Sequence, residues 1–250
     1  RAVPLQIEDY GLFLLNGVIG FSASIVLFHW AILMFEKAAS CAVVFSANPI
    51  FILFVARFVN REPWNVLKWT AMAAGAAGVA FFAWESGGVT SQSLAGLGLM
   101  LASAFLFAVS ICLVRRVIAR YGVFILTGFS ALFGSLVVLP FAVAVTARYG
   151  ADGLARAWAP TLYVALAGTA MGYGLYYFGL SRSTLFQASM MFFLKPVLAS
   201  LLAVLLLHET INGFMLAGSG FILAGLALTV GNQLLERRRN KGLTGAGRSE

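Results

Sequence analysis

The chain has 250 residues, of which 61% are hydrophobic and 10% are charged, and its formal net charge is +8. A soluble domain carries about 25% charged residues, so this composition excludes an ordinary soluble fold. The positive charge lies between apolar runs and in the C-terminal tail, with no basic stripe on a polar face, and this pattern argues against nucleic-acid binding.

Eight apolar segments follow one another, each near the roughly 20 residues that a helix needs to cross a bilayer. Their apolar residues are continuous and do not alternate, which predicts helices and not barrel strands. The predicted fold class is therefore an all-α membrane protein, a polytopic helical bundle. The segments are Tyr10–Met34, Ala38–Val59, Trp64–Trp84, Leu94–Val117, Gly122–Ala147, Trp158–Leu180, Thr184–Leu207 and Ile211–Leu235.

A weak pattern recurs after 147 residues. Pro49 and Glu62 stand thirteen residues apart, and so do Pro196 and Glu209. This offset maps the first three segments on the last three, and it leaves the fourth and fifth without counterparts. We therefore expect a unit of five plus five helices, of which this chain lacks the first two. Because five is odd, corresponding helices run in opposite directions and the repeat is inverted.

The predicted organisation has three parts. Residues 1–92 hold the last three helices of the first copy, residues 93–235 hold the five helices of the second, and residues 236–250 form a basic tail that we expect to be disordered. Thirteen Lys and Arg residues fall on the side that holds both termini, against three on the other side. The positive-inside rule then predicts a multi-pass protein of the inner or plasma membrane with both termini in the cytoplasm.

Two stretches, 38–82 and 184–229, resemble the paired copies of the EamA domain of the drug/metabolite transporter superfamily. Each has a small-residue helix start, a mid-helix proline, a helix-end glutamate and a following helix rich in Gly and Ala. The resemblance implies ten helices, inverted repeats, a central cavity, alternating access and export of a metabolite. The resemblance covers nearly the whole chain, and the chain departs from the family pattern in lacking the first two helices.

Lys195 is the residue that stands out most. It lies in the middle of its segment, too far from either end for its side chain to reach the membrane surface. A charge at the bilayer centre costs roughly 2.5–3.5 kcal/mol on insertion scales, so it must face the bundle interior, water or an anionic partner. Three interpretations stay open: an anchor for an anionic substrate, a structural lysine, or a proton-coupling group.

Other polar and aromatic residues at mid-depth are candidates for the same cavity. The 147-residue offset relates Asn48–Pro49 to Lys195–Pro196, and a proline inside a helix frees a carbonyl that can face substrate. We expect the two prolines to kink their helices, although a packed kink without a ligand is the alternative. The remaining substrate-binding candidates are His29, Trp30, Tyr173, Tyr176 and Tyr177, which could instead form an interfacial aromatic belt.

Glu62 and Glu209 each stand at the start of the following helix. A carboxylate there complements the positive end of the helix, so a structural cap is one interpretation and gating through loop arginines is the other. The runs 71–78 and 218–220 are rich in Gly and Ala, which allows close helix packing within the bundle or at a homodimer face.

The chain shows no nucleotide loop, no metal-ligand cluster and no nucleophile–base set, so it predicts neither an enzyme nor a cofactor. The predicted function is a secondary transporter, an exporter of a small metabolite such as an amino acid or another carboxylate, with small-molecule substrate and lipid bilayer as its partners. The alternatives are a non-transporting or truncated membrane scaffold and, more remotely, a membrane enzyme.

Overall fold

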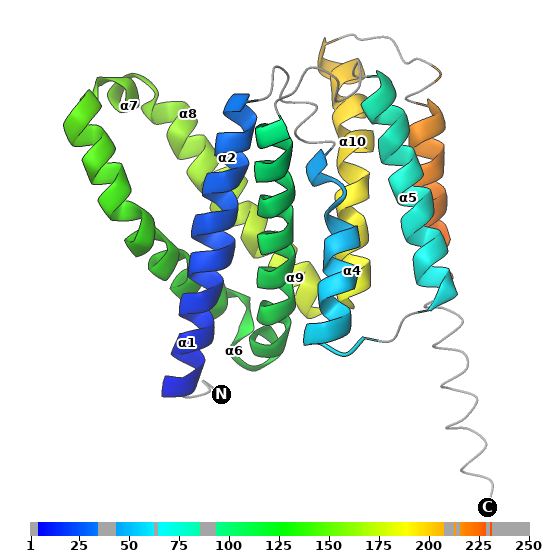
Figure 1. Ribbon diagram of the computed structural model, residues 1–250, viewed down its shortest axis with the longest axis horizontal. Coiled ribbons are helices and arrows are strands. Elements are labelled where there is room, and N and C mark those ends of the chain that lie inside the picture. Colours follow the sequence, from blue (N-terminus) through cyan, green and yellow to red (C-terminus); the bar gives the residue numbers. More distant parts are fainter. Residues whose placement is uncertain are drawn as a thin grey trace, which may run out of the picture.

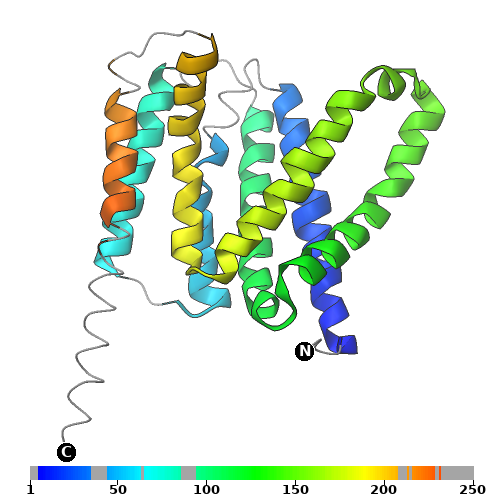
Figure 2. The same cartoon turned by 180° about the vertical axis from the view of Figure 1, so that it is seen from behind.

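The computed structural model describes residues 5–34, 44–62, 65–85, 94–207, 213, 216–228 and 231, and every regular element among them is helical. Figures 1 and 2 show a bundle whose helices run up and down between two ends. The elements are α1 (Ile7–Asn16), η1 (Gly17–Ala23), α2 (Ser24–Met34), α4 (Asn48–Val59), α5 (Val66–Glu85), α6 (Leu94–Tyr149), α7 (Asp152–Arg156), α8 (Trp158–Tyr163), η2 (Val164–Met171), α9 (Gly172–Ser181), α10 (Leu185–Leu207) and a helix over Leu216–Leu228. The all-helical membrane fold predicted from the sequence is confirmed.

Three described helices are long and apolar enough to cross a membrane: Ile7–Met34, Ala95–Arg115 and Val117–Tyr149. Shorter apolar helices over Asn48–Val59, Val66–Phe81, Leu185–Leu198 and Leu216–Leu228 accompany them. Each overlaps one of the segments expected from hydropathy. The segment Trp158–Leu180 is also helical, through α8, η2 and α9 in succession.

The long element α6 consists of two helices joined at Gly122. Gly122 has φ 79° and ψ 173°, a backbone conformation that a residue with a Cβ rarely adopts. The chain therefore reverses there, and the second half of α6 diverges from the first half in Figures 1 and 2. The first half is the centre of the bundle, because Met100, Ala104, Ala108 and Ile111 are fully buried on it.

Two segments, η1 and η2, are π-helical, and each lies in the middle of a long apolar helix. They begin at Gly17 and Val164, which are 147 residues apart, the offset of the sequence repeat. A π-helical turn loosens the regular i→i−4 hydrogen bonding and occurs often at functional sites. η1 leads into α2 and η2 leads into α9, and Phe21 of η1 contacts Tyr173 of α9, their ring centroids being 4.4 Å apart.

Pro49 does not lie inside a continuous helix as the sequence predicted. A turn at Ser46–Ala47 interrupts the segment, and α4 begins at Asn48 with the proline in its first turn. The first turn has no intrahelical partner for its N–H groups, so a residue without an N–H is tolerated there. Residues 35–43, which hold the predicted start of this segment, lie outside the described residues.

Three glycines of the Gly/Ala-rich helices, Gly75, Gly78 and Gly225, are covered by contacts within the chain, whereas Gly220 is exposed. A Cβ added to Gly78 would lie 2.6 Å from the carbonyl oxygen of Gly218, and one added to Gly225 would lie 2.7 Å from that of Ala71. Gly75 meets the ring of Phe193 on α10 in the same way. These contacts bring α5 and the helix Leu216–Leu228 close together, as small residues allow in membrane bundles.

Candidate functional site

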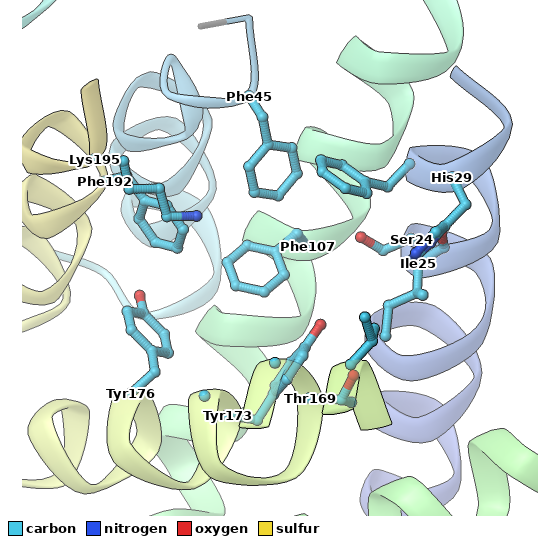
Figure 3. A pocket seen from close by; sticks show the side chains of 14 residues that line it. Ser24, Ile25, His29, Phe45, Phe107, Thr169, Tyr173, Tyr176, Phe192 and Lys195 are labelled. Atoms are coloured by element: carbon cyan, nitrogen blue, oxygen red, sulfur yellow. The ribbon is translucent and has the colours of Figure 1, made fainter. Parts of the chain in front are cut away.

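A cavity of about 550 Å³ lies between α2, the first half of α6, η2, α9 and α10 (Figure 3). Its walls are mainly aromatic and aliphatic, and hydroxyl, imidazole and ammonium groups are set among them. The lining residues are Ser24, Ile25, Phe28, His29, Phe45, Phe107, Val164, Gly168, Thr169, Gly172, Tyr173, Tyr176, Phe192 and Lys195. A cavity with apolar walls and a few polar groups is the usual form of a small-molecule site.

The cavity lies toward the end of the bundle where α2 ends. Along the first helix the lining residues fall between Ser24 and His29, whereas Phe13 and Asn16, nearer the start of α1, are buried. Along α6 the lining residue Phe107 is followed toward the other end by the fully buried Ile111. The same order holds on α9, where Tyr177 and Leu180 after the cavity are buried, so the cavity is closed on the side where α1 begins.

Hydrogen bonds reinforce this closed end. The amide nitrogen of Asn16 donates to Ser130 Oγ at 2.9 Å, and the hydroxyl of Ser110 donates to Asn16 Oδ1 at 2.5 Å. The three side chains are buried, and they join α1 to both halves of α6. Buried polar groups that satisfy one another hold helices in one register, so this network fixes the base of the cavity.

A second set of contacts ties the chain together at the outer edge of the closed end. Asp9 forms an ion pair with Arg120 at 3.2 Å and accepts a hydrogen bond from the hydroxyl of Tyr121. Arg115 donates to the carbonyl oxygen of Leu180 near the end of α9, at 2.5 Å. A cation at a helix C-terminus complements the negative end of the helix, so Arg115 joins α9 to α6.

Lys195 projects from α10 into the cavity, and its side chain is exposed there (Figure 3). Its Nζ lies 4.4 Å from the ring centroid of Phe192 and 5.2 Å from that of Phe45. Aromatic faces attract a cation, so these rings hold the ammonium group where no carboxylate is at hand. Among the described lining residues there is no Asp or Glu, and Lys195 is the single Lys or Arg.

His29 lies on the opposite side of the cavity from Lys195 in Figure 3. Its Nδ1 is 2.8 Å from the carbonyl oxygen of Ile25 in the preceding turn. A carbonyl only accepts hydrogen bonds, so Nδ1 carries a proton, and in the neutral form of the ring the lone pair is on Nε2. The hydroxyl of neighbouring Ser24 donates a hydrogen bond to the carbonyl oxygen of Ser103, 3.0 Å away.

The other residues singled out from the sequence divide into two groups. Tyr173 and Tyr176 line the cavity, whereas Tyr177 is fully buried beneath them. Trp30 is 55% exposed on the outer face of α2, because one residue along a helix turns the side chain by about 100° from His29. Asn48 is fully buried outside the lining, and neither amide atom has a hydrogen-bond partner among the described residues.

Of the two helix-end glutamates, the structure describes Glu62, which is not among the residues that line the cavity. Glu62 pairs with Lys68 on α5 at 3.4 Å, close to the closed end of the bundle. Pro196 lies inside α10, directly after Lys195. Glu209 lies outside the described residues.

The phenylalanines of the cavity were not singled out in the sequence as substrate-binding residues. Phe45 and Phe192 are related by the 147-residue offset, and their centroids lie 6.1 Å apart across the cavity wall. Phe107 contacts both, at 5.7 and 5.4 Å. The offset could have identified the first two, but no pattern separated Phe107 from the chain's 22 phenylalanines.

Comparisons with known proteins agree with this architecture. The model of the EamA-like transporter family matches residues 94–231, more than half of the chain. An uncharacterized transporter of Clostridium kluyveri is 28% identical over 90% of this chain and 73% of its own length. A probable amino-acid metabolite efflux pump of Salmonella typhimurium is 28% identical over 77% of this chain and 67% of its own. A crystal structure with 19% identity superimposes with a TM-score of 0.69, over 90% of this chain and 77% of that one, and shows the shared fold.

An all-helical bundle of apolar helices around a one-sided cavity defines the class as a multi-pass membrane transporter. The extent of the family match places the chain within that class. It belongs to the EamA-like transporter family.

Proposed function

We propose that this transporter is a secondary exporter that moves a small carboxylate, an amino acid or another organic acid, by alternating access. The observation that carries the proposal is the one-sided cavity into which Lys195 projects from mid-helix without an acidic partner among the described lining residues. A cation at mid-membrane without a counter-ion is costly, and it is retained where it serves a ligand. The name of the Salmonella relative, an efflux pump, supports the outward direction.

The transport cycle would use the two copies as its moving parts. Residues 1–92 and 93–235 are the proposed repeats, and the matching positions of η1 and η2 support this division. Asn48 lies behind the cavity wall in this conformation, and its unpaired amide would be available to the cargo or to water when the repeats rearrange. Glu62 would act as a helix-end group near the closed side.

A bulky side chain inside the cavity should stop transport. Gly172 lines the cavity, and a Cβ there would meet nothing closer than the carbonyl oxygen of Ala167 at 3.8 Å. Gly172→Trp therefore fills the cavity without a backbone clash. We expect it to lose most of the flux of labelled carboxylate in sealed vesicles, while it reaches the membrane in normal amount.

Gly179→Trp is the matched control for this variant. Gly179 is exposed on the same helix α9, outside the lining, with no atom within 4 Å of an added Cβ. Its flux should equal that of the unmodified chain. Equal flux in both variants would exclude this cavity as the path, and no carboxylate flux in the unmodified chain would favour a non-transporting scaffold.

The proposed orientation places the closed end of the bundle in the cytoplasm of a cell with a plasma or inner membrane. Arg115, Arg120 and Arg182 lie at that end, where basic residues stay on the cytoplasmic side. In a cysteine-substituted chain, an impermeant thiol reagent added outside should label position 90, which lies outside the described residues, and not position 120. Labelling at 120 alone would reverse the topology.

A further inference from the structure

We infer that the cavity selects a carboxylate that has no ammonium group beside it, has an apolar or aromatic body, and ends in a hydrogen-bond donor. The inference rests on the proposed function and narrows its substrate class. It combines the three parts of the cavity in Figure 3: Lys195 on one side, His29 on the other, and aromatic rings between them. Each part favours one feature of the cargo.

The Lys195 side disfavours a zwitterion. The cargo's carboxylate would accept hydrogen bonds from the ammonium group, which gains from a charged partner. An α-ammonium group on the same cargo would then lie close to Lys195, and like charges repel strongly where water is scarce. No Asp or Glu among the described lining residues could receive it, and the nearby faces of Phe45 and Phe192 are already in contact with Lys195.

The centre of the cavity fits an apolar body. Phe107 and Phe192 stand edge to face with centroids 5.4 Å apart, and Tyr176 lies 5.4 Å from Phe192. The hydroxyl of Tyr173, on the floor of the cavity, reaches the carbonyl oxygen of Gly20 at 3.5 Å. Rings packed against one another in this way form an apolar wall of the cavity, and such a wall favours an apolar or aromatic body on the cargo.

The His29 side favours a donor. Nδ1 of His29 donates to the carbonyl oxygen of Ile25, so Nε2 is the ring nitrogen left for a cargo, and in the neutral form of the ring it accepts a hydrogen bond. The Ser24 hydroxyl beside it already donates a hydrogen bond to the carbonyl oxygen of Ser103. A hydroxyl or N–H group at the far end of the cargo would donate to Nε2, whereas a second carboxylate there would meet an acceptor.

Three compounds that differ by one group each test this class. 3-Phenylpropionate is phenylalanine without its ammonium group, and 3-(4-hydroxyphenyl)propionate adds a distal hydroxyl. In binding measurements on the purified chain we expect 3-phenylpropionate to bind at least about tenfold more tightly than phenylalanine. The hydroxylated acid should bind about fivefold more tightly than 3-phenylpropionate, which corresponds to about 1 kcal/mol for one neutral hydrogen bond.

His29→Phe should remove the preference for the hydroxylated acid and leave the preference against phenylalanine. Val26→Phe is the control, because Val26 is on α2, 45% exposed and outside the lining; it should keep both preferences. Tighter or equal binding of phenylalanine would overturn the inference, and so would a hydroxyl preference that survives in His29→Phe.

The outcomes also separate this inference from the proposed function. If phenylalanine binds as well as 3-phenylpropionate, and Lys195→Met weakens both, the cavity takes carboxylates but does not exclude zwitterions, so the inference alone fails. If neither acid binds and Lys195→Met changes the flux of no other carboxylate, both fail.

Discussion

The Lys195→Met variant is expected to carry a small carboxylate at least about tenfold more slowly than the unmodified chain in sealed vesicles. Methionine keeps much of the apolar stem and removes the charge that projects into the cavity between Phe45 and Phe192. A hydrogen bond to a charged group contributes about 1.5–3 kcal/mol, and tenfold corresponds to the lower limit of that range. Lys195→Arg should restore only part of the flux, because guanidinium differs from ammonium in size and geometry.

The amount of protein in the membrane should not fall in Lys195→Met, because a charge at mid-membrane opposes insertion. Lys241→Met, in the polar tail, removes the same charge from the chain and should leave the flux unchanged. Flux has to be compared at equal protein levels. Undiminished flux in Lys195→Met would make Lys195 a structural residue and remove the main support for an anionic cargo.

Gly17→Val is expected to lower the stability of the bundle strongly. A Cβ at Gly17 would lie 2.5 Å from the carbonyl oxygen of Ser130 and 2.9 Å from the backbone nitrogen of Gly134. Both neighbours are backbone atoms, which cannot move aside as a flexible side chain can. Overpacking typically costs about 1–3 kcal/mol, and the cost is at the upper end when backbone must shift. The thermal unfolding midpoint in detergent should fall by several degrees.

Gly11→Val on the same long helix is the matched control for this prediction. An added Cβ at Gly11 meets no atom within 4 Å, and the residue is exposed. Its unfolding midpoint should stay close to that of the unmodified chain, because the added side chain meets no neighbour. The control is matched because both variants place a β-branched residue in a helix. Equal loss in the two variants would trace the effect to helix propensity and contradict the close approach of η1 to the second half of α6.

Hydropathy alone was sufficient to predict the fold class and most of the helix positions. Continuous apolar runs near 20 residues allow only helices in a bilayer, because each backbone group must be satisfied within its own segment. The break at Ser46–Ala47 was missed, because the residues around it are as apolar as those of a continuous helix. Pro49 was noticed, but a proline fits both a kink and a first turn, and sequence does not choose between them.

The candidate site was predictable only in part. A lysine in the middle of an apolar helix is costly if it faces the lipid, so Lys195 could be assigned to the bundle interior from sequence. His29 and Trp30 are adjacent and were treated alike, and the structure separates them because helix rotation turns one toward the cavity and the other outward. Phe107 was not singled out, because an aromatic residue in an apolar helix has no distinctive pattern before the partner helices are placed.

The central claim is that Lys195 holds the carboxylate of the cargo. The most direct test measures whether the gain in binding affinity from a charge on the ligand depends on the charge of Lys195. The ligands are 3-phenylpropionate and its neutral amide, 3-phenylpropanamide, and the proteins are the unmodified chain and Lys195→Met. We expect the unmodified chain to bind the acid at least about tenfold more tightly than the amide, and Lys195→Met to bind the two alike. The same preference for the acid in both proteins, or no preference in either, would contradict the assignment.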